Sequence, residues 1–286
     1  MQDHALALHR DELVAIVSRV HAVRPLHKVR LTGGEPLLRH DIVDIVTALR
    51  GALPSTTLAL TTNGTRLASF AEPLRGAGLD AVNISLDAVD AERFRALTRG
   101  GNVATVLSGL AAAARAGIEK RKLNAVLLAS YNGTSLADLV RLAADHGAEA
   151  RFIELMPSGP GRALHPHEFL SADEALARIA SKLSYVGPLG QAGTATRHRL
   201  RDGDRLLTVG FITPVSHPFC DGCDRLRLDA RARLLACLRS DTHVDLLEPL
   251  RNGRLDEVER RICLLLASKS APTKAWVARN MVAIGG

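Results

Sequence analysis

Residues 57–86, TLALTTNGTRLASFAEPLRGAGLDAVNISL, decide the fold class. The runs 57–62 and 81–86 are short, apolar and bounded by turn residues, as strands of a buried sheet are. Between them, residues 67–74 repeat apolar side chains at helical spacing. A helix between two such strands predicts that the strands lie parallel in one sheet, with the helix packed on its face.

The same alternation of helix and strand extends to both sides of this stretch. It predicts a parallel sheet with helices outside, which is a barrel or part of one. The further strands are expected at residues 28–32, 122–128 and 150–156, and the further helices at 11–23, 40–49, 91–97, 103–116 and 136–146.

Polar and glycine-rich segments follow the predicted strands. The strands end in Thr32-Gly33-Gly34-Glu35-Pro36, Thr61-Thr62-Asn63-Gly64, Ser85-Leu86-Asp87 and Glu154-Leu155-Met156-Pro157. Each segment alone is ordinary turn chemistry. Because the active sites of such barrels lie at the carboxyl ends of the strands, their recurrence at successive strand ends indicates a binding site there.

The pattern changes after about residue 160. Residues 159–170 read as a loop, and the pair His165 and His167 is interpreted as part of it. Short elements then follow: a helix at 172–181, strands at 197–201 and 205–212, and helices at 244–250 and 255–270. We therefore expect a first domain over residues 1–160 and a second over residues 161–286.

Three of the four cysteines fall within residues 219–238, FCDGCDRLRLDARARLLACL. Cys220 and Cys223 form a C-x2-C pair, and a turn with one short hairpin would return Cys237 to the same point. Three converging thiolates indicate a metal centre. We favour an iron-sulfur cluster with one open iron over structural zinc, which wants four ligands, and a disulfide is the weakest alternative.

A fourth ligand for zinc is not obvious from the sequence. His217 and His243 are candidates, whereas Cys263 stands in a helical pattern that predicts a small buried apolar residue. Between the metal-binding cysteines, residues 224–229 alternate charged and apolar side chains, as a half-exposed strand does. Arg225 and Arg227 then share one face and are interpreted as an anion clamp beside the metal.

Composition narrows the class of ligand. The net charge of +7 favours anionic partners, while aromatic residues make up only 3% of the chain, which leaves few platforms for stacking bases. A phosphorylated small molecule is therefore favoured over nucleic acid. No signal peptide is recognisable and no apolar run reaches the roughly 20 residues of a membrane span, so a cytoplasmic location with no membrane contact is expected.

The chain contains, in this order, the segments GGEP, TTNG, NISLD, the strand with Lys122, ELMP, C-x2-C-x-R-x-R…C and the closing Gly285-Gly286. Together they resemble the GTP 3',8-cyclase family of radical S-adenosylmethionine (SAM) enzymes in molybdenum cofactor biosynthesis. The resemblance implies an α/β fold: an incomplete (β/α)6 radical SAM barrel whose first strand is absent, with a C-terminal iron-sulfur domain.

The resemblance also implies the chemistry and the site. A reduced cluster cleaves SAM to a 5'-deoxyadenosyl radical, which takes hydrogen from C3' of GTP, and the sugar radical adds to C8 of the base to give 3',8-cyclo-7,8-dihydro-GTP. Site residues carry over as follows: GTP contacts at Arg30, Thr61, Lys122, Arg225, Leu226 and Arg227, with Lys28 a weaker candidate; SAM contacts at Gly34, Ser85 and Met156; and a 4Fe-4S cluster at Cys220, Cys223 and Cys237.

The implied partners are a reductant such as flavodoxin or ferredoxin and a downstream cyclic pyranopterin monophosphate synthase, with the chain a monomer or homodimer. The family's second 4Fe-4S cluster, which generates the radical, is held by a C-x3-C-x2-C loop, yet no cysteine precedes Cys220 here. We therefore expect an N-terminally truncated chain that is inactive by itself. The alternatives are a noncatalytic GTP-binding iron-sulfur relative and a zinc-stabilised module that binds nucleic acid.

Overall fold

The computed structural model describes residues 8–220 and 222–269. The predicted Gly285-Gly286 tail lies outside the described residues. The helices are α1 Arg10–Val23, the 3-10 helix η2 Pro36–Leu38, α2 Ile42–Ala52, α3 Leu67–Gly76, α4 Ala91–Thr98, α5 Val103–Arg115, α6 Leu136–Asp145, α7 Gly161–Glu168, α8 Ala172–Ala180, α9 Leu247–Arg251 and α10 Leu255–Ala267. The strands are β1 Lys28–Leu31, β2 Thr57–Thr62, β3 Ala81–Ser85, β4 Lys120–Leu127, β5 Glu149–Glu154, β6 Ser184–Ala192, β7 Ala195–Asp202, β8 Arg205–Ile212, β9 Arg227–Leu228, β10 Arg233–Leu235 and β11 His243–Asp245.

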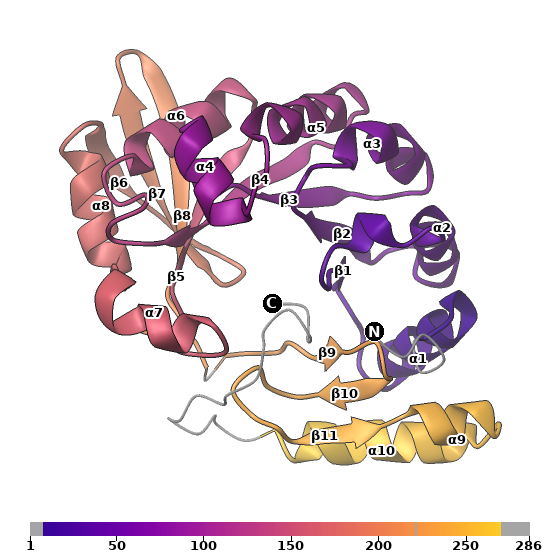
Figure 1. The fold of residues 1–286 in the computed structure, drawn as a ribbon. Coiled ribbons are helices and arrows are strands. Elements are labelled where there is room, and N and C mark those ends of the chain that lie inside the picture. Colours follow the sequence, from indigo (N-terminus) through magenta and orange to yellow (C-terminus); the bar gives the residue numbers. More distant parts are fainter. Residues whose placement is uncertain (1–7, 221, 270–286) are drawn as a thin grey trace.

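The main sheet has eight strands in the order β1-β2-β3-β4-β5-β8-β7-β6. Strands β1 to β5 and β8 run parallel, and β6 and β7 are antiparallel to their neighbours. The sheet curves around a central opening, and its helices lie on the outer side (Figure 1). The predicted parallel α/β sheet is confirmed, and each predicted strand from 28–32 to 150–156 lies within a few residues of an observed one.

A single apolar core joins the outer face of the sheet to these helices. Leu60, Val82, Leu123 and Phe152 come from four neighbouring strands, and all are buried in the core cluster with residues of α2, α3, α5 and α6. Because strand side chains alternate between faces, burial of these positions turns the residues beside them toward the concave face. The binding residues predicted on the strands are those neighbours.

The cysteine segment belongs to a second, smaller unit. Strands β9, β10 and β11 form an antiparallel sheet that lies across the open side of the main sheet, with α9 and α10 beneath it (Figure 1). Its core gathers Leu234, Leu246 and Ile262 from the C-terminal half, together with Ile16 and Val20 of α1. The N-terminal helix is therefore packed into the C-terminal unit.

The segment 159–170, predicted to be a loop, forms α7 instead. Its prolines mislead the pattern, yet Pro160 at the N-cap position has φ of −60°, which suits a helix start. At the other end Phe169 donates its backbone N–H to the carbonyl of His165 at 3.1 Å and its ring packs on the imidazole.

The strand β6 was not predicted, and its glycines and proline explain why. Gly187, Pro188 and Gly190 argue against a strand interior, but β6 is an edge strand with register shifts at those positions. The predicted helix at 244–250 is also wrong in its first turn. Val244 lies in β11 and pairs with Leu234 of β10, and α9 starts only at Leu247. Pairing across the small sheet outweighs the local helical pattern there.

Cys263 is exposed rather than buried, which corrects the prediction from the helical pattern. The buried face of α10 is formed by Val258, Ile262 and Leu265, and Cys263 lies one residue beyond that face. None of the described helices is long and apolar enough to cross a membrane.

Candidate functional site

The parallel register places the predicted GTP residues of β2 and β4 in one row on the concave face. Thr61 of β2 lies beside Asn83 of β3, Asn83 beside Lys122 of β4, and Lys122 beside Glu149 of β5. Strand alternation and the register of parallel strands together bring these distant residues into contact.

Cations gather at this row. Arg30 of β1 donates from Nη1 to the hydroxyl of Thr61 at 3.2 Å. Burial, with the positive charges of Arg151 and Arg225, lowers the pKa of Arg30, and burial with the charge of Arg30 likewise lowers the pKa of Lys28. Repulsion among neighbouring cations is a condition that a bound polyanion would relieve.

Lys122 shows the strongest effect among the lysines of the row. Burial and the nearby charge of Arg151 lower its pKa to about 8, while Glu149 acts in the opposite direction. Arg151 itself lies on β5, and its Nε donates to the Glu149 carboxylate at 2.8 Å. The structure thus adds Arg151 to the site. In the sequence, the alternation of Arg151 with the apolar Phe152 could have indicated that Arg151 faces the concave side. A charged residue in a strand, however, usually faces solvent.

Two buried amides on the concave face have unpaired acceptors. The side-chain oxygens of Asn83 and Asn124 contact no donor in the described part of the chain, and Asn83 is only 4% exposed. Asn124 lies beside Ser85 in the register and beside Arg151 on its other side. Buried acceptors of this kind are suited to ligand hydroxyl or amino groups.

The predicted SAM residues lie at the carboxyl ends of their strands: Gly34 beyond β1, Ser85 at the end of β3 and Met156 beyond β5. Gly33 has φ of +140°, so only glycine fits there without strain. The carboxylate of Glu35 accepts from the Thr62 hydroxyl and the Asn63 N–H, both at 2.7 Å. The GGEP and TTNG segments are thereby fastened to one another.

Glu154, at the end of β5, is a structural anchor that sequence reasoning missed. It is fully buried, and its carboxylate accepts from the N–H groups of Ala172, Val215 and Ser216 at 3.1, 3.0 and 2.9 Å, and from the Ser216 hydroxyl. This one side chain ties β5 to the N-terminus of α8 and to the segment that leads into Cys220. In the sequence, an acidic residue at the end of a buried strand could have indicated this role of Glu154.

The cysteine hairpin brings the three predicted ligands near shared cations. The N–H of Cys223 donates to the carbonyl of Cys220 at 3.1 Å, which closes the tight turn. Arg239 donates its backbone N–H to the sulfur of Cys237 at 3.3 Å, and its guanidinium lies 3.9 Å from the sulfur of Cys220. All the cysteines are free thiols.

The charge environment of Cys223 favours its thiolate form. Burial alone would raise the pKa of Cys223, but hydrogen bonds from Arg225 and its charge outweigh burial and lower that pKa. Burial lowers the pKa of Arg227 to about 10, against the effect of the sulfurs of Cys223 and Cys237 close by, so its guanidinium stays charged at neutral pH.

The donor chemistry therefore fits a thiolate-bound cluster. Within residues 8–220 and 222–269, however, no three His, Cys, Asp or Glu side chains are arranged to hold a metal ion. The candidate fourth ligands have hydrogen-bond partners of their own: His217 contacts the Ser216 hydroxyl, and His243 contacts the Asp241 carbonyl. The three-cysteine centre remains a prediction.

Of the predicted strand 224–229, only Arg227–Leu228 is paired as β9. Arg225 instead lies with its guanidinium 5.0 Å from the ring centre of Phe219, a cation–π contact. Its charge still acts on both Arg30 and Arg227. The cysteine hairpin thus contributes cations to the same region as β1.

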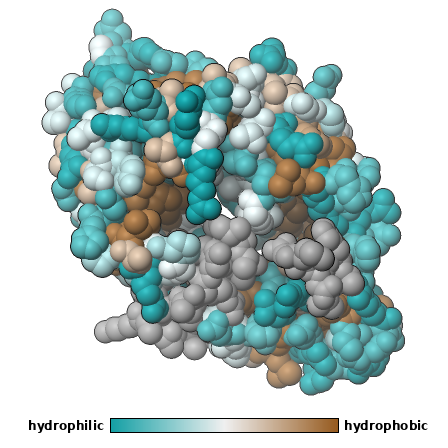
Figure 2. Space-filling view, in the orientation of Figure 1, coloured by the Kyte–Doolittle hydropathy of each residue, from teal (hydrophilic) through white to brown (hydrophobic). Residues whose placement is uncertain are grey.

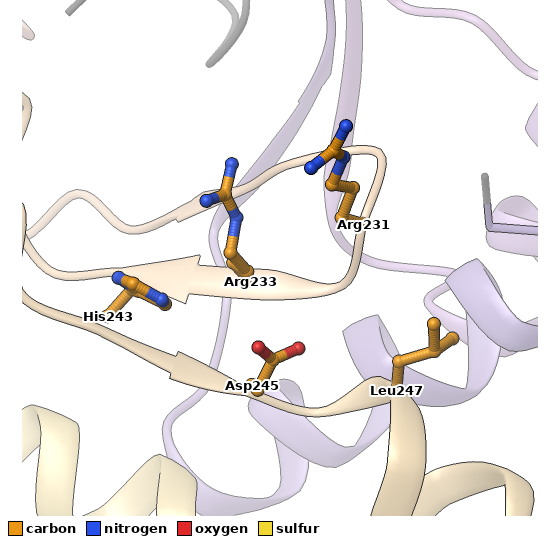
Figure 3. A pocket seen from close by; sticks show the side chains of 5 residues that line it. All are labelled: Arg231, Arg233, His243, Asp245 and Leu247. Atoms are coloured by element: carbon orange, nitrogen blue, oxygen red, sulfur yellow. The ribbon is translucent and has the colours of Figure 1, made fainter. Parts of the chain in front are cut away.

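The space-filling view (Figure 2) shows how hydrophobic and hydrophilic residues are distributed on one face of the molecule. Hydrophobic residues border the central hollow in Figure 2, whereas hydrophilic residues cover most of the periphery. A separate pocket lies on the small sheet, where Arg231 and Arg233 point the same way above Asp245 (Figure 3). Arg233 is paired there with Asp229 at 2.7 Å, and no predicted GTP or SAM residue lines this pocket.

Comparison with known proteins finds two family models that match this chain. Residues 2–143 match the model of the radical SAM superfamily, and residues 148–275 match the model described as Molybdenum Cofactor Synthesis C. With the parallel α/β sheet and the glycine-rich strand ends, these matches define a radical SAM enzyme.

Curated relatives identify the family within that class. GTP 3',8-cyclase of Pseudomonas putida (strain W619) is 42% identical over 89% of this chain and 77% of its own length. GTP 3',8-cyclase of Heliobacterium modesticaldum is 39% identical over 91% of this chain and 80% of its own length. The chain belongs to the GTP 3',8-cyclase family.

Proposed function

We propose that this protein acts in molybdenum cofactor biosynthesis by converting GTP to 3',8-cyclo-7,8-dihydro-GTP through radical SAM chemistry. The observation that carries the proposal is the gathering of cations on the concave face of the sheet. Three different strands contribute these cations, which are Lys28, Arg30, Lys122 and Arg151. Arg225 of the hairpin adds its positive charge to the same region. A triphosphate needs several such cations, and guanidinium forks match its oxygens well.

We propose further that GTP is gripped by side chains. The sequence has no G-x4-G-K-[ST] loop, so backbone cradling of the phosphates in the P-loop manner is not available within it. Arg30, Thr61, Lys122 and Arg151 bind the triphosphate, and Arg225 to Arg227 approach it from the hairpin. Support comes from the Arg30–Thr61 bond and from the cations' mutual effect on their pKa values.

SAM is proposed to bind at the carboxyl ends of β1, β3 and β5, through Gly34, Ser85 and Met156. Support comes from the exposure of Gly34 and Ser85 and from the bonds that Glu35 makes to the TTNG segment. Gly34, Ser85 and Met156 would hold SAM, which would supply a 5'-deoxyadenosyl radical on one-electron reduction by an iron-sulfur cluster. The chain's own residues hold GTP and SAM in place.

The architecture we propose is an incomplete (β/α)6 barrel over residues 1–160 and a domain over 161–286 that carries a 4Fe-4S cluster on Cys220, Cys223 and Cys237. Strands β6, β7 and β8 of this second domain extend the main sheet. In the described sheet β1 is an edge strand, which supports an open barrel. The cluster would offer an open iron to the base of GTP. Residues 1–219 contain no cysteine, so we assign no residue of this chain to the radical-generating cluster.

Calorimetric binding of GTP to the anaerobically purified chain tests the proposal. Arg30→Ala is expected to weaken GTP binding by about tenfold, because a hydrogen bond from a charged donor is worth roughly 1.5–3 kcal/mol. Arg115→Ala, which removes an exposed cation at the end of α5 on the outer side, is the matched control and should bind GTP normally.

Loss of affinity in both variants would point to non-specific attraction by net charge. Absence of GTP binding by the unmodified chain, together with salt-sensitive binding of single-stranded RNA, would overturn the proposed function and favour a nucleic-acid-binding module.

A further inference from the structure

The Glu149–Arg151 pair occupies an unusual place in the cationic row. Both side chains are largely buried, with 11% of Arg151 and 19% of Glu149 exposed. The pair is joined by one bond of 2.8 Å from Nε of Arg151 to Oε1 of Glu149. Within the described residues this is the one hydrogen bond that the guanidinium donates, so four of its five N–H donors are left for other acceptors.

Glu149 also carries a negative charge into a region assigned to a polyanion. It lies beside Lys122 in the register, and Lys122 in turn is close to Arg151, Lys28 and Arg30. A carboxylate there repels phosphate, which weakens binding unless the carboxylate contributes something else. Orientation of Arg151 is a contribution that this geometry provides.

The neighbouring strand is shaped to accommodate the pair. Gly210 of β8 lies beside Arg151 in the register. A Cβ atom at Gly210 would stand 3.2 Å from Oε1 of Glu149 and 3.5 Å from Cγ of Arg151, with Ala195 a further 3.4 Å contact. Since contacts below 3.4 Å require a neighbour to shift, a larger residue would displace the carboxylate.

We propose that Glu149 is a positioning residue: by holding Nε of Arg151 in the space left by Gly210, it directs the two Nη groups toward the triphosphate of the substrate. The inference rests on the proposed function. Arg151 is then a preorganised fork whose side-chain freedom is already restricted before GTP arrives, which lowers the entropic cost of forming two parallel bonds to phosphate.

Binding of GTP and of inorganic triphosphate to the full chain and two variants tests this role. Glu149→Ala should weaken both by about tenfold although it removes a repulsive charge, because the fork is no longer held. Glu149→Gln keeps an oxygen that accepts from Nε, so its affinity should stay within about threefold of the unmodified chain or increase. SAM affinity should be unchanged in both variants.

Two further experiments test the role independently: a double variant of Glu149 and Arg151, and a variant that crowds the space at Gly210. In an Arg151→Ala background, Glu149→Ala should cause no further loss of affinity, since the residue acts through Arg151. Gly210→Ala, which keeps both partners but crowds the carboxylate, should weaken triphosphate binding while SAM binding persists. Persisting SAM binding also shows that each variant is folded.

The outcomes separate the inference from the proposed function. Tighter triphosphate binding by both Glu149 variants would show that Glu149 acts only as a counter-charge, and would overturn the inference while GTP binding stands. Equal affinity in the unmodified chain and Glu149→Ala would also overturn it. If the unmodified chain binds neither GTP nor triphosphate, the proposed function itself fails.

Discussion

Lys122 is the residue whose charge state would most affect the proposed phosphate binding near neutral pH. Its folded-state pKa of about 8 lies below the ordinary lysine value of 10.5 because of burial and the charge of Arg151. Between these two values the unfolded chain holds the proton and the folded chain does not. This lysine therefore makes the free energy of unfolding rise with pH across that window, and its penalty is fully present below it.

We expect GTP affinity to fall as pH rises through about 8, because deprotonated Lys122 no longer attracts phosphate. The loss approaches tenfold per pH unit above that value for one coupled proton. Calorimetry at pH 7, 8 and 9 in buffers of different ionisation enthalpy measures both the affinity and the proton uptake. Arg30, Lys28, Arg151 and Glu149 surround the same ammonium group.

Lys122→Arg is the control for this titration. Arginine stays protonated across the range, so the variant should bind GTP without the decline between pH 7 and 9. A decline of the same size in Lys122→Arg would assign the titration to another group, of which Lys28 is the nearest candidate, since burial lowers its pKa too.

Sequence reasoning at this scale predicted Arg30, Thr61 and Lys122 as binding residues but did not predict a role for Arg151 or Glu149. All five lie on the concave face by the same alternation. Alternation shows which residues share a face, but it does not show which charged residues are buried, because burial depends on strands far away in the chain. For Arg151 the deciding neighbour is Gly210, 59 positions further along.

Among the elements, helix α1 has two buried faces that belong to different cores. Ile16 and Val20 pack into the core of the small cysteine-bearing unit, whereas Val14 and Val17 pack against the core of the main sheet. Ion pairs reinforce the first contact, with Arg19 bonded to Glu259 of α10 at 2.6 Å. The helix thus joins the two units.

Ile16→Ala is expected to loosen the cysteine-bearing unit. Ile16 is fully buried, and removing such a side chain typically lowers the free energy of unfolding by about 2–5 kcal/mol. Hydrogen exchange should show faster exchange of the β10 amides around Leu234, which shares the core with Ile16. Denaturant titration measures the stability change.

Val17→Ala serves as the matched comparison on the opposite face. It should leave exchange in β10 close to that of the unmodified chain, since Val17 contacts the other core. Similarly faster hydrogen exchange of the β10 amides in both variants would mean that α1 affects only the stability of the whole molecule and not the cysteine-bearing unit in particular.

At the scale of the whole molecule, the site is formed where the hairpin faces the concave side of the sheet. Arg225 acts electrostatically on Arg30 across this region, although the two residues are far apart in the chain. Lys269 reaches back to the hairpin and donates to the Arg225 carbonyl at 2.7 Å. Under the proposed function, GTP binding therefore requires both units in place.

The hairpin's predicted cluster is tested by composition. Anaerobically purified chain should contain iron and acid-labile sulfide in the ratio of one 4Fe-4S cluster, and Cys220→Ser should lose both. Cys263→Ser, which changes the exposed cysteine on α10, should retain them. Stoichiometric zinc without sulfide would instead identify a structural zinc site and remove the open iron from the proposed function.

The sequence by itself determined the alternation of helices and strands, the parallel sheet, the glycine-rich strand ends and the family. These are local patterns, and the order of GGEP, TTNG, ELMP and the cysteine pair can be read from the sequence alone. Only the tertiary structure decided that α1 packs into the C-terminal unit, that β6 forms a bulged edge, and that Glu149, Arg151 and Gly210 meet. The physical reason is that burial and pairing between distant segments depend on neighbours which no local pattern of residues specifies.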